Sequence, residues 1–386
     1  MSTSKRVYLD NAATTWPKPE AVYDAVGDYM RNLGGAAGRG AHDAAGQANQ
    51  LIDLCRVRLS QLLEAESAER IALLFSATDA LNTALHGAIH AGDHVVTTAI
   101  EHNSVLRPLA ELAVRHGVES TVVPCDAEGR IDPSALKEAL RPATRLVVCS
   151  HASNVVGTKQ RLSDIVDVAH DAGAMVLIDA AQSVGQVPIS VRDVPVDLLA
   201  ASGHKSLLGP LGTGFLYVRP GMEDRLQSLR QGGTGTDSSS SRHPERMPEK
   251  LEAGNHNVPG LAGLAAALDY LQQYDIAQVA RHHQSLMQDL REKLLAIPGV
   301  TIYGPSRVED CVGVVSINVT GWDCHELASV LQTAFQIQAR AGLHCAPRIH
   351  PYIGSDKDGG TLRISVGVFT TRDDIDTAVH AIRSVA

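Results

Sequence analysis

Lys205 is the residue whose surroundings most clearly suggest chemistry. It follows an apolar run in DLLAASGHKSLLGPLGTG (residues 197–214), among glycines and small side chains. Burial in such a setting removes water from the amine and keeps it nucleophilic, as Schiff-base formation requires. Ser202 and His204 beside it could donate hydrogen bonds to a phosphate. A surface lysine in a turn is the alternative, which this context disfavours.

Asp179 ends a second apolar run, VLIDAAQ (residues 176–182). A carboxylate at the end of a buried strand can pair with a protonated pyridine nitrogen and so hold the ring as an electron acceptor. Taken alone, such an Asp more often caps a turn or a helix. Its position at the end of a strand adjacent to the one before Lys205 favours the cofactor interpretation.

The segment LLFSATDALNTAL (residues 73–85) is typical of a strand, a short turn and a helix. Backbone N–H groups at the start of that helix, around Ala77, could hold a phosphate together with the Thr78 hydroxyl. Helix capping by Ser76 or Thr78 would produce the same pattern and is compatible with phosphate binding.

His102 and Asn154 follow two further predicted strands, in TTAIEHNSV and SHASNVVGT. An imidazole at the first place could stack on a cofactor ring, although a lone histidine more often serves packing or lies on the surface. The Asn154 amide could donate a hydrogen bond to a ring hydroxyl.

Cys345 lies in RAGLHCAP (residues 340–347), a loop bounded by glycine and proline, beside His344. A partly exposed thiol near cationic groups can ionise and attack. Cys149 and Cys55, in an apolar run and an amphipathic helix, are predicted to be packed core thiols. Arg363 lies in a predicted strand that points back towards the Cys345 loop. Its guanidinium could bind a carboxylate at two points or, equally, pair with a structural carboxylate.

Alternating β-rich and amphipathic segments must position these residues. Nearly continuous apolar strands separated by helices predict a mainly parallel sheet with helices on both faces, and ligand sites at the carboxyl ends of its strands. The predicted strands are Ile71–Phe75, His94–Thr97, Ser120–Val123, Arg145–Cys149, Met175–Ile178 and Asp197–Ala201. The predicted helices between them are Ala80–His90, Ser104–His116, Pro133–Leu140 and Leu162–Ala172.

The composition and the predicted elements change from residue 231 onwards. Residues 231–248 are rich in Gly, Ser and Pro and predict a long loop. A smaller α/β unit is expected over 298–386, and Thr371 with Asp374 resembles a capping box at the start of the last helix. The other elements predicted here are helices Gly260–Gln273, Ile276–Ile297 and Cys324–Phe335, and strands Val314–Asn318 and Leu362–Val366.

Composition narrows the classes of function. The chain has 386 residues, 44% of them hydrophobic, and a net charge of −9 without an evident basic face. We therefore expect a globular chain with two domains and without nucleic-acid or membrane partners. The N-terminus does not resemble a signal peptide, and the cysteines show no CxxC spacing, so we expect a cytoplasmic location and no metal site. The sequence has neither GxGxxG after the first strand nor GxxxxGK[ST], so it lacks the fingerprints of Rossmann and P-loop nucleotide-binding sites.

Eight segments in order resemble motifs of the cysteine desulfurase family, in the class V aminotransferase, fold-type I group. They are YLDNAATTWPKPEAV, SATDALN, EHNSVLRPL, SNVVGT, IDAAQSVG, SGHKSLLGPLGTG, EAGNHNVPG and RAGLHCAP, and they span nearly the whole chain. The last resembles the catalytic loop of Suf-type (group II) desulfurases. The resemblance implies an α/β fold with a large domain over 14–273 that holds a mainly parallel seven-stranded sheet. It implies a small domain made of 1–13 and 274–386.

The same resemblance implies the cofactor pyridoxal 5'-phosphate (PLP) and roles for individual residues. Lys205 would bind PLP covalently, and Cys345, Lys205 and His102 would be catalytic. In the family, a partner subunit completes each site, which implies a homodimer. Asn255 of EAGNHN would make that contact, where Thr is usual, and His256 replaces the usual Pro. The remaining implied cofactor contacts are Asp179, Gln182, Asn154, Ala77, Thr78, Ser202 and His204, and the implied substrate contacts are Arg363, Asn11 and Ala12.

The implied reaction converts L-cysteine to L-alanine, with sulfur transferred to Cys345 as a persulfide and then to an acceptor protein. Selenocysteine lyase, or another PLP-dependent cysteine or cystine C–S lyase, is the nearest alternative. An epimerase or transaminase, in which Cys345 is incidental, is another. A third alternative is a non-catalytic homologue. The presence of a complete set of candidate catalytic residues argues against it: Lys205, Asp179, His102, Cys345 and Arg363.

Overall fold

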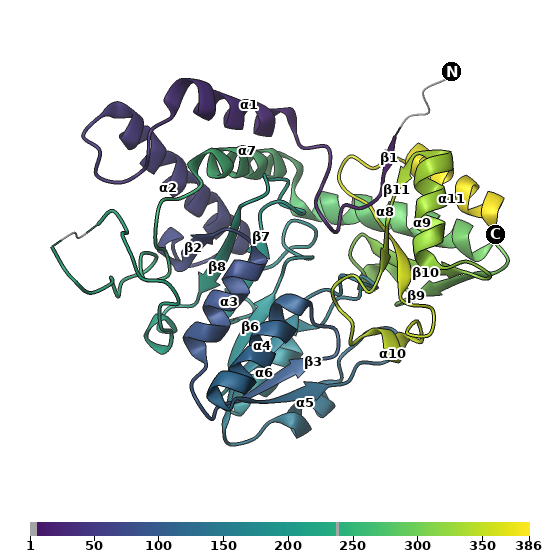
Figure 1. Cartoon of the computed structure of the whole chain (residues 1–386), viewed down its shortest axis with the longest axis horizontal. Coiled ribbons are helices and arrows are strands. Elements are labelled where there is room, and N and C mark those ends of the chain that lie inside the picture. Colours follow the sequence, from purple (N-terminus) through teal and green to yellow (C-terminus); the bar gives the residue numbers. More distant parts are fainter. Residues whose placement is uncertain (1–5, 237–238) are drawn as a thin grey trace.

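A seven-stranded sheet forms the centre of the larger part of the molecule (Figure 1). The structure is a computed structural model that describes residues 6–236 and 239–386. The strand order is β2-β8-β7-β6-β5-β3-β4, and all neighbours are parallel except β8, which is antiparallel to β2 and β7. The mainly parallel seven-stranded sheet is thus confirmed. Its strands are Ile71–Leu74 (β2), His94–Thr98 (β3), Glu119–Val123 (β4), Thr144–Ser150 (β5), Met175–Asp179 (β6), Leu198–Ser202 (β7) and Gly214–Val218 (β8).

Helices cover both faces of this sheet because its strands are apolar on both sides. In β6, Val176 and Ile178 belong to one buried cluster, and Met175 and Leu177 to the other. Asp43–Leu63 (α2), Pro133–Ala139 (α5), Leu162–Asp171 (α6) and Val258–Tyr274 (α7) contribute to the first cluster, and Ala77–Ala88 (α3) and Asn103–His116 (α4) to the second. Glu20–Asp28 (α1) lies against α7 (Figure 1).

A second sheet, with order β12-β13-β10-β9, forms the centre of the C-terminal unit at the right of Figure 1. The capping box at Thr371 and Asp374 is confirmed. The domain boundaries drawn from the sequence stay a prediction, and residues 1–5 lie outside the described chain. The elements of this unit are Val7–Tyr8 (β1), Ile276–Leu295 (α8), Val300–Tyr303 (β9), Val314–Val319 (β10), Cys324–Phe335 (α9), Ile337–Gln338 (β11), Arg340–Gly342 (β12), His350–Ile353 (α10), Thr361–Ser365 (β13) and Arg372–Val385 (α11).

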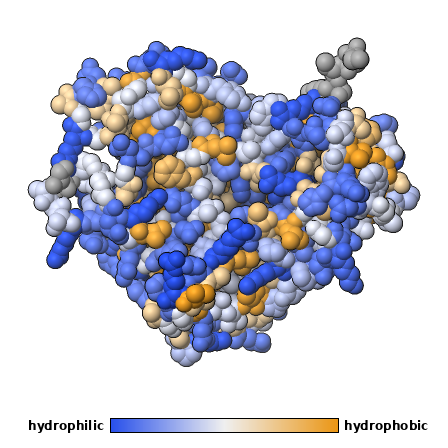
Figure 2. Space-filling model, in the orientation of Figure 1, coloured by the Kyte–Doolittle hydropathy of each residue, from blue (hydrophilic) through white to orange (hydrophobic). Residues whose placement is uncertain are grey.

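The loop predicted over 231–248 has no helix or strand in its described residues, and residues 237 and 238 lie outside the description. On the face shown in Figure 2, apolar residues form small patches among hydrophilic ones. Among the described helices, none combines the length and the apolar character needed to cross a membrane.

A buried ion pair joins α2 to the EAGNHN segment. The guanidinium of Arg56 donates to both carboxylate oxygens of Glu252, at 2.7 Å between Nη2 and Oε2, and also to the carbonyl of Ile71. Burial alone would raise the pKa of Glu252, but hydrogen bonds from Arg56 and His256 lower it. Because the pKa is lowered in the folded state, this stabilisation is present at neutral pH and is lost as the pH falls.

Replacing Glu252 with Gln is expected to destabilise the fold by about 3–5 kcal/mol, because it leaves the buried guanidinium of Arg56 without its counter-charge. Urea unfolding at neutral pH measures the effect. The matched control is Glu111→Gln, whose pair with Arg115 is exposed and should contribute less than about 1 kcal/mol. Equal losses from both variants would contradict the assignment.

Candidate active site

The predicted site residues gather around one cavity of about 200 Å³, where the carboxyl ends of the sheet strands meet loops of the C-terminal unit. All of them line it except Asn11 and Asn255. The lining residues from the prediction are Ala12, Ala77, Thr78, His102, Asn154, Asp179, Gln182, Ser202, His204, Lys205, Cys345 and Arg363.

Lys205 lies in the turn after β7, half-buried, beside Asp179. Burial lowers the pKa of its amine to about 8; the Asp179 charge opposes that shift, and Arg363 and Arg340 add to it. The backbone of the turn is fixed from the N-terminal segment. Thr15 Oγ1 donates to the Lys205 carbonyl at 2.9 Å, and Lys18 Nζ donates to the His204 carbonyl at 2.8 Å. The structure therefore presents a held amine with a much lowered pKa.

Asp179 ends β6 in the middle of the sheet, and its Oδ1 accepts a hydrogen bond from the Ala181 N–H at 2.9 Å. Gln182, in the following turn, donates from Nε2 to the Ala12 carbonyl at 2.9 Å. Its Oε1 is buried and has no partner within the described residues. A carboxylate and a free amide oxygen thus lie on the wall from which Lys205 also comes.

Small polar groups gather at the start of α3. Ser76 caps this helix by accepting from the Asp79 N–H, and Ser202 Oγ accepts from the Ala77 N–H at 2.9 Å. Burial, with Lys205 and Lys18 nearby, lowers the pKa of His204 to about 4, so its ring is neutral and can donate one N–H. A helix N-terminus surrounded by hydroxyl groups suits an anion.

His102 is fixed by Ser104. The Ser104 N–H donates to Nδ1 of His102 at 3.0 Å, so in the neutral ring the proton lies on Nε2. Burial lowers the pKa of His102, which favours that neutral form. Ser104 Oγ contacts both His102 Nδ1 at 2.9 Å and Thr78 Oγ1 at 2.7 Å. One serine therefore connects the histidine to the start of α3.

Cys345 is the one exposed cysteine in the described chain, and Cys55 and Cys149 are buried as predicted. His344 and Cys345 both have left-handed backbone, with φ of 51° and 58°. Two hydrogen bonds fix the loop: Asn103 N–H donates to the Cys345 carbonyl at 2.7 Å, and Asn154 Nδ2 donates to the His344 carbonyl at 2.5 Å. The Asn154 amide thus has a contact with the loop that sequence reasoning did not foresee.

His344 does not supply a cation near the Cys345 thiol. Its buried ring contacts Thr361, and burial lowers its pKa to about 2, so the ring is neutral. The positive charges that interact with the thiol belong to Lys205 and Arg363, and Arg340 lines the same cavity.

Arg363 lines the cavity and pairs with a structural carboxylate, which is one of the two alternatives predicted for it; its binding of a substrate carboxylate stays a prediction. Nη2 donates to Asp10 Oδ1 at 2.9 Å, and Nη1 donates to the Asn154 carbonyl at 3.0 Å. Its Nε is buried without a partner in the described structure. Asn11 lies behind the cavity, where Nδ2 donates to the Ser365 carbonyl at 2.9 Å.

Sequence reasoning missed three polar lining residues: Arg340, Ser104 and Ser150. Arg340 opens the RAGLHCAP motif, so its place in the motif was the available signal. Ser104 follows His102 by two residues, a spacing at which a helix-start N–H can reach back to a capping side chain. Ser150 ends β5 next to Asp179 in the sheet.

Asn255 lies outside this cavity and is exposed. It lines a separate small cavity that also contacts Phe75, Gly212 and Arg230. Within one chain, therefore, Asn255 does not line the cavity that contains Lys205.

The cavity residues fit PLP. Buried polar atoms around it have no partner within residues 6–236 and 239–386: Gln182 Oε1, His204 Nδ1, His344 Nδ1 and Arg363 Nε. An amine, a carboxylate and an anion-binding helix start surround the same space, as the aldehyde, the pyridine nitrogen and the phosphate of PLP require.

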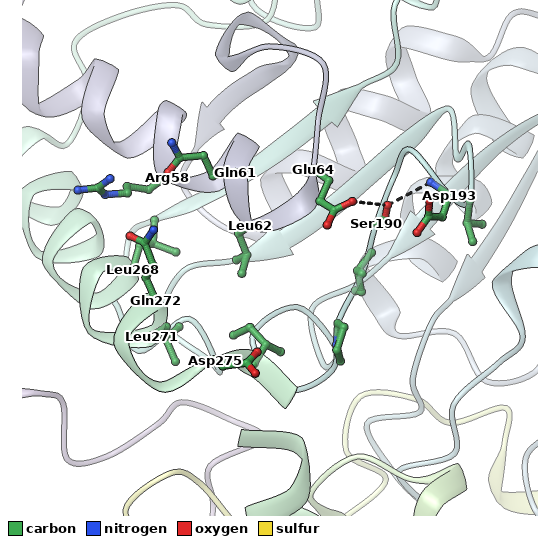
Figure 3. Close-up of a pocket in the computed structure, with 14 residues that line it drawn as sticks. Arg58, Gln61, Leu62, Glu64, Ser190, Asp193, Leu268, Leu271, Gln272 and Asp275 are labelled. Atoms are coloured by element: carbon green, nitrogen blue, oxygen red, sulfur yellow. Dashed lines mark hydrogen bonds between the residues drawn. The ribbon is translucent and has the colours of Figure 1, made fainter. Parts of the chain in front are cut away.

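A larger cavity, of about 650 Å³, lies between the ends of α2 and α7 and the loop containing Ser190 (Figure 3). In this cavity Arg58 pairs with Asp269, and Glu64 accepts a hydrogen bond from the Ser190 hydroxyl. Lys205 and Cys345 lie elsewhere, so we assign the chemistry to the smaller cavity.

Comparisons with known proteins identify the family of the chain. The aminotransferase class-V family model matches residues 7–378. A probable cysteine desulfurase of Methanothermobacter thermautotrophicus is 34% identical over 383 residues, 98% of this chain and 94% of that protein. A cysteine desulfurase of Escherichia coli is 31% identical over 98% of this chain and 93% of its own length.

Solved structures give the same result. A cysteine desulfurase from Thermococcus onnurineus, in its apo form, has a TM-score of 0.92 at 30% identity, covering 98% of this chain and 94% of that one. The cysteine desulfurase CsdA of Escherichia coli has a TM-score of 0.88 at 29% identity, with the same coverage. The chain therefore belongs to the class-V aminotransferase family and, within it, to the cysteine desulfurases.

Proposed function

We propose that this chain is a PLP-dependent cysteine desulfurase that converts L-cysteine to L-alanine and receives the sulfur on Cys345 as a persulfide. One observation carries the proposal: an exposed thiol shares a cavity of about 200 Å³ with Lys205, Asp179 and Arg363. An epimerase or a transaminase does not need the thiol, whereas sulfur transfer does.

In this proposal, the large-domain residues hold the cofactor. Bound PLP supplies an electron sink for breaking bonds at the α and β carbons of an amino acid. Lys205 would carry it, Asp179 would pair with its ring nitrogen, and Gln182 and Asn154 would contact its ring hydroxyl. Ser202, His204, Ala77 and Thr78 would bind its phosphate with neutral donors at the start of α3.

Lys205 and His102 move the protons. The Lys205 amine would take the proton from Cα, because burial holds its pKa near 8. His102 carries its proton on Nε2, and it exchanges protons with the substrate thiol and with the carbon that becomes the methyl group of alanine. Ser104 keeps the ring in this tautomer.

Arg363 and Cys345 act on the substrate from the C-terminal unit. The guanidinium of Arg363 binds the α-carboxylate with the N–H groups that Asp10 and Asn154 do not use, and Ala12 forms the adjacent wall. The Cys345 thiolate then attacks the substrate sulfur. The new S–S bond forms as the Cβ–S bond breaks, and the electron pair stays with the carbon fragment that is protonated to alanine.

A homodimer is part of the proposal, on the basis of family resemblance. Asn255 is exposed and does not line the Lys205 cavity of its own chain. In the proposed dimer it is available to contact the phosphate end of the partner's site. Phe75, next to Ser76 at the start of α3, is 53% exposed and lines the same small cavity as Asn255. An acceptor protein that removes the sulfur from Cys345 completes the proposed reaction.

Cys345→Ser should lower alanine formation from L-cysteine by about 100-fold or more, because the hydroxyl cannot accept the sulfur. Alanine is measured under reducing conditions at matched PLP occupancy. Cys324→Ala, at a buried cysteine at the start of α9, is the matched control and should keep most of the activity. Wild-type rates in Cys345→Ser would exclude Cys345 as the sulfur acceptor.

Cofactor capture should depend on the Lys205 amine. The rate at which the apoenzyme develops the visible absorbance of bound PLP should rise with pH and level off above about 8, where the amine is neutral. An ordinary lysine would titrate near 10.4. Lys205→Ala should not develop this band, whereas Lys293→Ala, at a surface lysine, should behave like the wild type. A Lys205→Ala protein that keeps the band would disprove the cofactor assignment.

A further inference from the structure

Two arginines lie directly opposite each other at the active site. Arg340 on β12 and Arg363 on β13 are paired residues of antiparallel strands, so their side chains leave the same face of the sheet. Both line the cavity. Like charges at such a position repel each other, so the pair needs a compensating group.

Asp10 is that group. Its Oδ1 accepts from Arg363 Nη2 at 2.9 Å, and its Oδ2 accepts from Arg340 at 3.2 Å. Asp10 forms a parallel bridge with Ser365, and the next two residues also bond to Ser365, through Asn11 Nδ2 and the Ala12 N–H. The segment that carries the Asp10 carboxylate is therefore held against β13 at Ser365.

The three side chains carry two positive charges and one negative charge, which leaves one net positive charge. They differ in exposure: Arg363 is 2% exposed, Asp10 17% and Arg340 47%. Arg363 is thus the fixed, buried partner for a carboxylate, and Arg340 is the more accessible one. Arg340 lines the cavity together with Cys345, towards which the substrate side chain must point.

We propose that Asp10 is a positioning residue that determines specificity. It fixes the Arg363 guanidinium and cancels one of the two positive charges. The site then matches an amino acid with one carboxylate and an uncharged side chain, such as L-cysteine, and disfavours an amino acid with an acidic side chain. The inference rests on the proposed function, in which Arg363 binds the substrate α-carboxylate.

The test measures binding by the PLP-loaded enzyme. L-Alanine and L-aspartate are titrated separately while the visible spectrum of the bound cofactor is followed, and the ratio of their dissociation constants, aspartate to alanine, is compared between variants. Asp10→Asn raises the net charge to two and should lower this ratio about tenfold. Arg340→Gln lowers the net charge to zero and should raise it by a similar factor.

The double variant Asp10→Asn with Arg340→Gln restores one net charge and should return the ratio towards the wild-type value. A purely structural role for Asp10 would not produce this reversal. Asp132→Asn is the matched control, because Asp132 caps α5 away from the cavity and asparagine caps a helix equally well. It should leave the ratio unchanged.

An unchanged ratio in Asp10→Asn, with normal affinity for L-alanine, would overturn the inference. If Asp10→Asn does not bind PLP, the test rests on Arg340→Gln alone. An unchanged aspartate-to-alanine ratio in that variant would also overturn the inference. The proposed function fails differently. If Arg363→Gln binds L-alanine as tightly as the wild type, then Arg363 is not the carboxylate site, whatever Asp10 does.

Discussion

The hydrogen bonds made by residues 10–18 hold the two halves of the active site together. On one side, Thr15 and Lys18 donate to the carbonyls of Lys205 and His204 in the turn that follows β7. On the other side, Asn11 and Ala12 bond to Ser365 in β13. This short segment contacts both the amine that carries the cofactor and the strand that carries Arg363. Without it, the sheet and the C-terminal unit would each contribute an incomplete set of groups.

Burial then decides which groups in the cavity are charged. It lowers the pKa of Lys205 to about 8, that of His204 to about 4 and that of His344 to about 2. The imidazoles are therefore neutral hydrogen-bonding groups, and the two arginines carry positive charge at every pH at which the protein is folded, whereas Lys205 loses its charge above about pH 8. A substrate with a carboxylate meets fixed charge at one end of the cavity and neutral donors at the other.

Most of the large domain could be predicted because each strand is short, apolar and followed by a recognisable turn. The same local patterns located Lys205, Asp179 and His102. By contrast, β8 was not among the strands predicted from local pattern, although its residues follow Lys205 closely. Its antiparallel direction could not be predicted either, because an apolar run carries no information about strand direction. Two other features depend on contacts between residues far apart in sequence. One is the antiparallel register that places Arg340 opposite Arg363, and the other is the contact of Asp10 with both arginines. The neutral state of His344 depends on burial, which local pattern does not give.

The Cys345 loop has a mechanical consequence. Two successive residues, His344 and Cys345, have left-handed backbone, and the carbonyls of both accept hydrogen bonds, from Asn154 and from Asn103. A peptide segment restrained in this way has little freedom to travel. In the proposed reaction, sulfur bound to Cys345 stays at the mouth of the cavity. The recipient must bring its own nucleophile to that fixed place, so the shape of the surface around the thiol selects which molecules can collect the sulfur.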